Sequence, residues 1–160
     1  MPYAEKIRTA KNAGQLFDIA KAIVRKYLGI DQAGLLVGMS DLGTSMNGFV
    51  GAYYSPDANT IILNKRSLAR MQQTNPKYYN YYLFHLLLHE YIHSIGSYDE
   101  AQTRLVVGEI SRRCFGEEHP ITQLSANLNA YLQGIEDMPP EDRSIEYVSG
   151  IDRKNTNYIN

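Results

Sequence analysis

The sequence has little of several features that would place a protein in a class at once. A single cysteine, Cys114, occurs in 160 residues, which excludes an internal disulfide and indicates a reducing compartment. Sixteen basic and seventeen acidic residues leave a net charge of −1, so neither sign is in excess for binding nucleic acid or an anionic membrane. Apolar runs are short, and the first residues contain no apolar core of signal-peptide type. We therefore expect a cytoplasmic protein with neither a nucleic-acid nor a membrane partner.

The length and composition predict one globular domain and a polar tail. Hydrophobic residues make up 44% of the chain and charged residues 21%, which is typical of a globular protein that can bury a core. We assign residues 1–137 to the domain. Residues 138–160 are polar with few apolar side chains, so we expect a flexible C-terminal tail. Its carboxylates Glu141, Asp142 and Glu146 suggest the hypothesis that the tail folds back and blocks a functional site.

The hydrophobic pattern predicts an α+β domain. Apolar residues recur at steps of three and four over 4–28, and a short apolar run at 34–39 predicts a strand. Two further strands flank a turn signal, Ser-Pro-Asp-Ala-Asn, at 55–59. Helices should follow, with Ser97 and Glu100 forming the capping box of one of them. The expected fold is a small antiparallel or mixed three-stranded sheet packed on an N-terminal and a central helix, with further helices after them. The predicted strands are 34–39, 48–54 and 60–64, and the predicted helices are 4–28, 64–71, 76–95, 97–115 and 121–132.

The central helix carries the most informative motif of the chain, His-Glu-Tyr-Ile-His at 89–93. Residues four apart lie on the same face of a helix, so His89 and His93 can reach one metal ion. Glu90 projects beside them, where it can polarise a metal-bound water and accept its proton. Composition alone predicts only about 0.005 copies of this pattern in a chain of this length. The motif therefore indicates a metal site, with Zn²⁺ as the expected ion and Glu90 as the catalytic residue.

A catalytic zinc site usually has three protein ligands, so a carboxylate must complete the set. The candidates are Glu100, Asp99 and Glu109. If the chain turns at Gly96, Glu100 lies roughly 4 Å along the returning helix and Glu109 roughly 18 Å, at 1.5 Å per residue. His93 lies about 6 Å from the same corner. This arithmetic favours Glu100, and Asp99 stays open as the alternative third ligand.

A resemblance to known families supports this set of ligands. The motif followed by Asp99-Glu100-Ala101 is similar to the gluzincin metallopeptidases, whose third ligand is a glutamate in such a stretch. Residues 51–64 before it resemble the sheet of minigluzincins and ImmA/IrrE-type zincin domains. The spacing from His89 to Asp99 also matches a metzincin-like variant with aspartate as third ligand. The gluzincin resemblance covers residues 48–104, about a third of the chain, and implies that the strand at 60–64 is the edge strand above the cleft.

The sequence therefore predicts a zinc-dependent metallopeptidase of the HExxH type. Its substrate would be a peptide or an unfolded protein, and Glu90 would move the protons. The alternative is a catalytically silent module that keeps the metal site for regulation or protein interaction. Three further residues need an account: His85 is expected in the core or behind the metal ligands, Tyr91 in the core, and His119 is a candidate donor to the reacting carbonyl or a surface residue.

Overall fold

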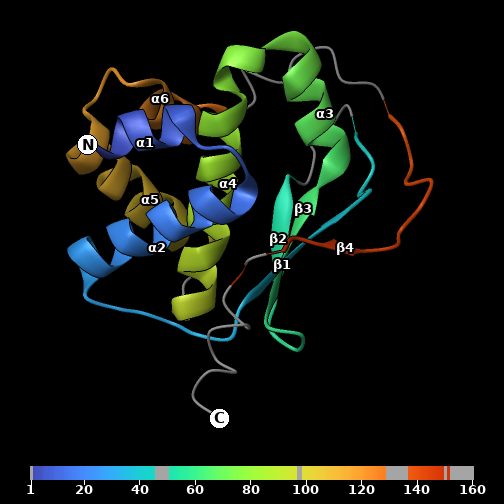
Figure 1. Ribbon diagram of the computed structural model, residues 1–160, viewed down its shortest axis with the longest axis horizontal. Coiled ribbons are helices and arrows are strands. Elements are labelled where there is room, and N and C mark those ends of the chain that lie inside the picture. Colours follow the sequence, from blue (N-terminus) through green and yellow to red (C-terminus); the bar gives the residue numbers. More distant parts are fainter. Residues whose placement is uncertain (1, 46–50, 97–98, 129–136, 150, 152–160) are drawn as a thin grey trace.

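The computed structural model describes residues 2–45, 51–96, 99–128, 137–149 and 151. Within these residues the chain forms six α-helices, one 3₁₀ turn (η1) and a sheet of four strands (Figure 1), which confirms the α+β class. The helices are α1 (Tyr3–Thr9), α2 (Ala13–Leu28), α3 (Lys65–Thr74), α4 (Tyr79–Ile95), α5 (Glu100–Phe115) and α6 (Pro120–Ala126), with η1 at Pro76–Tyr78. The strands are β1 (Leu36–Ser40), β2 (Ala52–Ser55), β3 (Thr60–Asn64) and β4 (Glu146–Tyr147).

The sheet is mixed, with the strand order β2-β3-β1-β4. Strands β1 and β3 are parallel, with Leu36 opposite Thr60, whereas β2 and β4 pair antiparallel with their neighbours. The implied edge position of Thr60–Asn64 is wrong, because β3 lies between β2 and β1 and all five of its residues are buried. Within the described sheet the outer strand on this side is β2.

The N-terminal helical segment is two helices rather than one. Asn12 has an extended backbone (φ −160°, ψ 170°), and its side chain accepts a hydrogen bond from the amide of Gln15, which starts α2 afresh. The amide group of Asn80 donates to the carbonyls of Ile7 and Ala10 and so holds the end of α1 and the residue after it against α4. The apolar periodicity continues through the break between α1 and α2, so the sequence pattern predicted a single helix.

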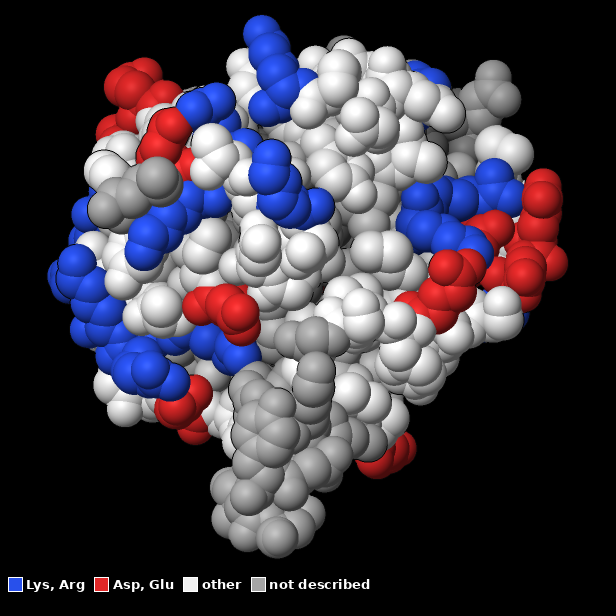
Figure 2. All heavy atoms as spheres, viewed as in Figure 1, with Lys and Arg blue, Asp and Glu red and all other residues white. Residues whose placement is uncertain are grey.

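Helix α4 lies at the centre of the molecule, between the sheet on one side and α1, α2, α5 and α6 on the other (Figure 1). It packs against α2, α5 and α6 on one side and against β2 and β3 on the other. The tyrosine-rich start of this helix is structural: Tyr82 is fully buried and its hydroxyl donates to Ser67 at 2.9 Å. On the face shown in Figure 2, basic and acidic side chains lie in mixed groups.

The expected tail is attached to the sheet at two places, Met138 and β4. Met138 forms a bridge with Thr44, and β4 pairs with β1 through Gly38 and Met39. Gly38 permits this approach, since a Cβ atom there would lie 2.6 Å from Ile145. Residues 138–149 therefore have defined contacts with the sheet, and the flexibility of the tail stays a prediction. Residues 150 and 152–160 lie outside the described residues.

The three carboxylates that motivated the blocking hypothesis have partners away from the cavity, which contradicts that hypothesis. Glu141 contacts Arg66, Glu146 contacts Lys65, and Asp142 accepts from the amide of Ser144. Arg66 and Lys65 belong to the start of α3, and β4 is at the edge of the sheet opposite β2. Among the described helices, none is long and apolar enough to cross a membrane.

A buried ion pair fastens the C-terminal segment to the sheet. Asp41 is 5% exposed and accepts hydrogen bonds from Arg66 at 2.7 Å and from the amides of Gly43 and Glu141. Burial alone would raise the pKa of Asp41, but the hydrogen bond from Arg66 and the two amides outweigh it and lower the pKa to about 2.

We predict that Asp41→Asn lowers the free energy of unfolding at pH 7 by on the order of 2 kcal/mol, because Arg66 and two amides lose an ionised acceptor. Since the folded pKa is depressed, the contribution of Asp41 is present above the unfolded pKa of about 3.9 and is lost as the pH falls toward about 2. Denaturant unfolding of wild type and variant between pH 7 and pH 2.5 should therefore converge at low pH. Asp18→Asn, which changes an exposed carboxylate, is the control, and a constant difference across this pH range would contradict the prediction.

Candidate metal centre

Helix α4 has one face packed in the core and another that lines a cavity. Leu83, Leu87 and Tyr91 are buried in the core, whereas His89 and Glu90 line a cavity next to the sheet. His93 lies one turn beyond His89 and lines the same cavity, as the four-residue spacing requires. The helix ends at Ile95, and Gly96 follows in an extended conformation (φ −146°). The motif is therefore on a helix, as predicted, and His89, Glu90 and His93 line the cavity.

The first turn of α5 brings a carboxylate to these histidines. Asp99 is the N-cap: its side chain accepts from the amide of Gln102 at 2.7 Å, and the side chain of Gln102 accepts from the amide of Asp99. The capping box expected from Ser97 and Glu100 is thus formed by Asp99 and Gln102, and Ser97 lies outside the described residues. Since Glu100 is not needed for the cap, its side chain is available to α4.

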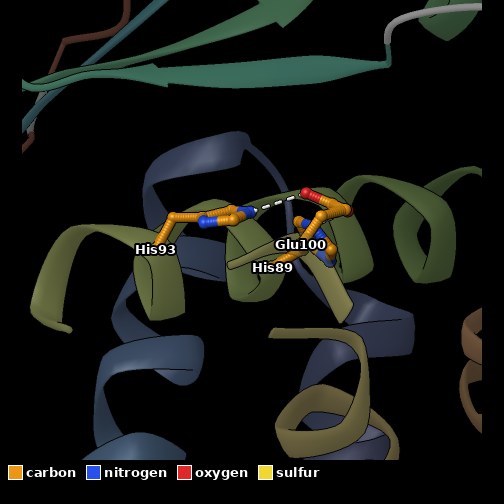
Figure 3. A group of neighbouring side chains, drawn as sticks. All are labelled: His89, His93 and Glu100. Carbon is orange, nitrogen blue, oxygen red and sulfur yellow. Dashed lines mark hydrogen bonds and ion pairs between the residues drawn. The ribbon is translucent and has the colours of Figure 1, made fainter. Parts of the chain in front are cut away.

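Glu100 bridges the two histidines (Figure 3). One carboxylate oxygen lies 2.9 Å from Nε2 of His89, and the other lies 2.9 Å from Nε2 of His93. One ligand atom from each of the three residues lies within 4.8 Å of the others. In Figure 3 the three side chains meet above α4, beneath a strand of the sheet. The structure therefore assembles a group that could hold a metal ion, and no ion is needed to explain how α4 and α5 are placed.

The other two candidate carboxylates are engaged elsewhere. Asp99 caps α5, and Glu109 forms ion pairs with Arg112 and Arg113 three and four residues further along the same helix. Neither belongs to the group formed by His89, His93 and Glu100 within the described part of the chain.

The donor set fits a divalent transition-metal ion. Ligand atoms about 2 Å from a shared tetrahedral ion lie roughly 3.3 Å apart, and the two His–Glu separations of 2.9 Å are already close to this value. Two imidazole nitrogens with one carboxylate also form the ligand set of several catalytic zinc sites, which leave a fourth position open. The arrangement is preformed, so binding would require little rearrangement of the chain.

Two further residues of α5 support the site, and the sequence analysis did not identify them. The hydroxyl of Thr103, which is fully buried, lies 3.3 Å from Nδ1 of His93, and Nε of Arg104 lies 3.3 Å from Glu100. If Nε2 of His93 binds an ion, Nδ1 carries the ring's proton. The Nδ1–H group then donates a hydrogen bond to the hydroxyl of Thr103, which fixes the orientation of the ring. The helical spacing could have identified both residues, because positions three and four residues after Glu100 lie on the same face of a helix as Glu100.

Glu90 lies in an environment that favours its neutral form. The residue is 7% exposed, and burial, followed by the negative charge of Glu100, raises the pKa of its carboxyl to about 8. A cation held by the triad would oppose both effects and bring this pKa down. The carboxyl can therefore change its protonation state near neutral pH, which is the property that a general base needs.

The pKa shifts of His89 and Glu100 both favour the forms that bind a metal ion. Burial lowers the pKa of His89, the nearby Glu100 raises it, and the net direction is downward. Burial also raises the pKa of Glu100, but the charge of His89 and the hydrogen bond from His93 outweigh this, and the net direction is again downward. A neutral imidazole beside an ionised carboxylate is the state in which both bind a metal.

The cavity above the triad has a volume of about 900 Å³ and is open to solvent. Its floor is the face of α4 from His85 to Gly96, which extends over about 16 Å at 1.5 Å per residue. Strand β2 forms one wall, and α5 with residues 125–128 forms the other. An extended peptide rises about 3.3 Å per residue, so roughly five residues can lie along this floor.

Tyr91, His119 and His85, for which the sequence analysis gave expectations, lie in three different environments. Tyr91 is fully buried, packs edge-on against Phe17 and accepts a hydrogen bond from the amide of Gln32, so its core position is confirmed. His119 is not a cavity residue: its Nδ1 accepts from the amide of Ile121 as the N-cap of α6. His85 lines the cavity but lies outside the group of three potential ligands.

Comparison with known proteins found no match: no protein-family model, no curated protein and no solved structure matches the chain. The site is therefore characterised by its geometry.

We predict that Glu100→Ala weakens Zn²⁺ binding roughly 100-fold or more, because the carboxylate is one of three potential ligands. Isothermal titration of the metal-free protein with Zn²⁺ measures this. Asp99→Asn preserves the N-cap and Glu109→Gln changes an exposed carboxylate, so both should bind as wild type does. A larger loss in Asp99→Asn than in Glu100→Ala would assign the third ligand to Asp99 instead.

Thr103→Val should weaken Zn²⁺ binding by about 10-fold, because the valine keeps the volume but removes the acceptor that orients His93. The matched control is Thr122→Val, which removes a buried hydroxyl that bonds to the carbonyls of Ser111 and Gly116, far from the triad in sequence. Equal affinities in the two variants would show that Thr103 does not orient a ligand.

Proposed function

We propose that this protein is a zinc-dependent peptidase. The observation that carries the proposal is the position of Glu90, whose nearly buried carboxyl lines the same cavity as His89, His93 and Glu100. A structural metal site needs ligands only, whereas a hydrolytic site also needs a base beside an open coordination position. We take zinc as the ion because imidazole and carboxylate ligands in this number are typical of catalytic zinc sites. The single cysteine supports the cytoplasm as its compartment.

When bound, zinc would polarise the carbonyl of the scissile peptide bond and acidify the attacking water. Glu90 accepts the proton of that water and later delivers it to the nitrogen of the leaving amine. Its low exposure keeps this proton away from bulk solvent between the two steps. Thr103 holds the ring of His93, and Arg104 holds the carboxylate of Glu100, so the triad stays in position while substrates change.

The proposed substrate is an extended segment of a peptide or of an unfolded protein. The cavity is long and open rather than closed, and β2, the outer strand of the described sheet on that side, contributes Ala52, Tyr53 and Tyr54 to its wall. A peptide lying along the floor of α4 can pair with the backbone of β2 as an added strand. The resemblance to gluzincins implies an edge strand at 60–64, but β3 lies inside the sheet, so we propose β2 for this role instead.

The alternative is a metal-binding module without catalysis, and one variant separates the two functions. Glu90→Gln keeps the size and polarity of the side chain but cannot accept a proton as a carboxylate does. We expect it to retain Zn²⁺ and to lose at least about 1000-fold in kcat for cleavage of unfolded casein, since the base is removed. Glu109→Gln is the control and should cleave as wild type does.

Mass spectrometry of the fragments from a panel of unfolded proteins and peptides, with and without a chelator, completes the test. Cleavage that needs Zn²⁺ and Glu90 supports the peptidase. If the wild-type protein holds Zn²⁺ but no substrate is cleaved faster than by the Glu90→Gln variant, the proposal is wrong and the silent module remains.

A further inference from the structure

The structure contains a third histidine in the cavity whose presence the metal site does not explain. His85 precedes His89 by four residues on α4, and their ring centroids are 6.0 Å apart. The residue is 6% exposed, and its Nδ1 is buried with no hydrogen-bond partner in the described structure. An unpaired buried polar atom costs about 1–3 kcal/mol, so a histidine at this position needs a reason other than packing.

The burial of Nδ1 fixes the form of the ring. A buried imidazole with no carboxylate bonded to it stays neutral, because burial disfavours the charged form. A neutral imidazole has one N–H and one lone pair. Orphaned buried N–H groups are rarer than under-satisfied acceptors, so the lone pair belongs on Nδ1 and the proton on Nε2. Because the ring lines the cavity while Nδ1 is sealed off, the Nε2–H edge faces the open space.

We propose that His85 donates a hydrogen bond from Nε2–H to the carbonyl oxygen of the scissile peptide bond as that oxygen becomes negative. This inference rests on the peptidase function proposed above. As the water oxygen bonds to the carbonyl carbon, the π electrons move to the carbonyl oxygen and the water proton passes to Glu90. His85 keeps its own proton throughout. When the C–N bond breaks, the electrons on oxygen re-form the carbonyl and Glu90 gives its proton to the amine nitrogen.

Three other donors that line the cavity, Arg104, Tyr54 and Ser94, are less suited to this role. Arg104 is paired with Glu100, and its side chain is 72% exposed, so water screens its charge. The hydroxyl of Tyr54 donates to Asn59, and that of Ser94 donates to the carbonyl of Tyr91. The ring of His85 is held by its burial, and a fixed donor stabilises a developing charge without reorganisation.

Steady-state kinetics of the zinc-loaded protein on a peptide cleaved by the wild type tests the role. His85→Phe should lower kcat by about 100-fold, with KM and Zn²⁺ affinity changed less than twofold, because the bond forms in the transition state. His85→Gln, which restores an N–H donor, should recover part of the loss. His119→Asn, which removes a histidine outside the cavity and keeps a capping side chain, should match wild type.

The kinetic outcomes separate this inference from the proposed function. A wild-type kcat in His85→Phe, or a loss of Zn²⁺ affinity that matches the loss of kcat, overturns the role of His85 while the dependence on Glu90 keeps the peptidase standing. A wild-type protein that cleaves nothing overturns both. A lowered melting temperature in His85→Phe without recovery in His85→Gln would assign His85 to packing and also overturn the inference.

Nuclear magnetic resonance tests the same inference without any catalysis. Long-range ¹H–¹⁵N spectra of the metal-free protein, labelled at histidine nitrogens, distinguish the two neutral tautomers and the charged ring. We expect the neutral Nε2–H form for His85 at pH 7. Detection of the Nδ1–H form or of a charged ring would overturn the inference, whatever the kinetics show.

Discussion

Helix α4 has to bury one side completely and keep a polar stripe on the other, and the placement of every other element follows from that constraint. Its leucines and Tyr91 remove a large apolar area from water, which is the main stabilising contribution available to a chain with no disulfide. Helices α2, α5 and α6 pack on this side, and β2 and β3 lie across the other. The sheet does not close over the stripe, so a cavity remains where the histidines emerge.

The turn from α4 to α5 decides which carboxylate meets the histidines. Asp99 is the N-cap, and a residue one position later in the first turn points back along the preceding helix. Glu100 has that position and the longer side chain, whereas Asp99 uses its carboxylate on the amide of Gln102. The positive end of the α5 dipole also favours a negative charge at Glu100. Local capping chemistry and the geometry of the site thus select the same residue.

The sequence predicted the parts of the fold that depend on local pattern. The motif helix, the turn at Gly96 and the proximity of Glu100 to His93 all follow from helical period and rise. The parallel pairing of β1 with β3 does not, since no local pattern records which strand lies between two others. The start of α2 at Asn12 was hidden by apolar residues that continue the period across it. Strand β4 was missed because two residues, Glu146 and Tyr147, pair through their backbone and are exposed.

The polar stripe of α4 is also the place where the chain departs from the rules that stabilise the rest of it. His85 leaves a nitrogen without a partner, Glu90 is a nearly buried acid without an ion pair in the described structure, and Glu100 holds two histidines in one arrangement. The first two of these features cost stability in the metal-free protein, while the opposite face of the same helix is packed without such conflict. Two such conflicts side by side in one cavity indicate residues that interact with something other than the protein itself. A cation between the histidines would stabilise the carboxylate of Glu90 and lower its pKa, and a bound carbonyl would accept a hydrogen bond from the Nε2–H of His85.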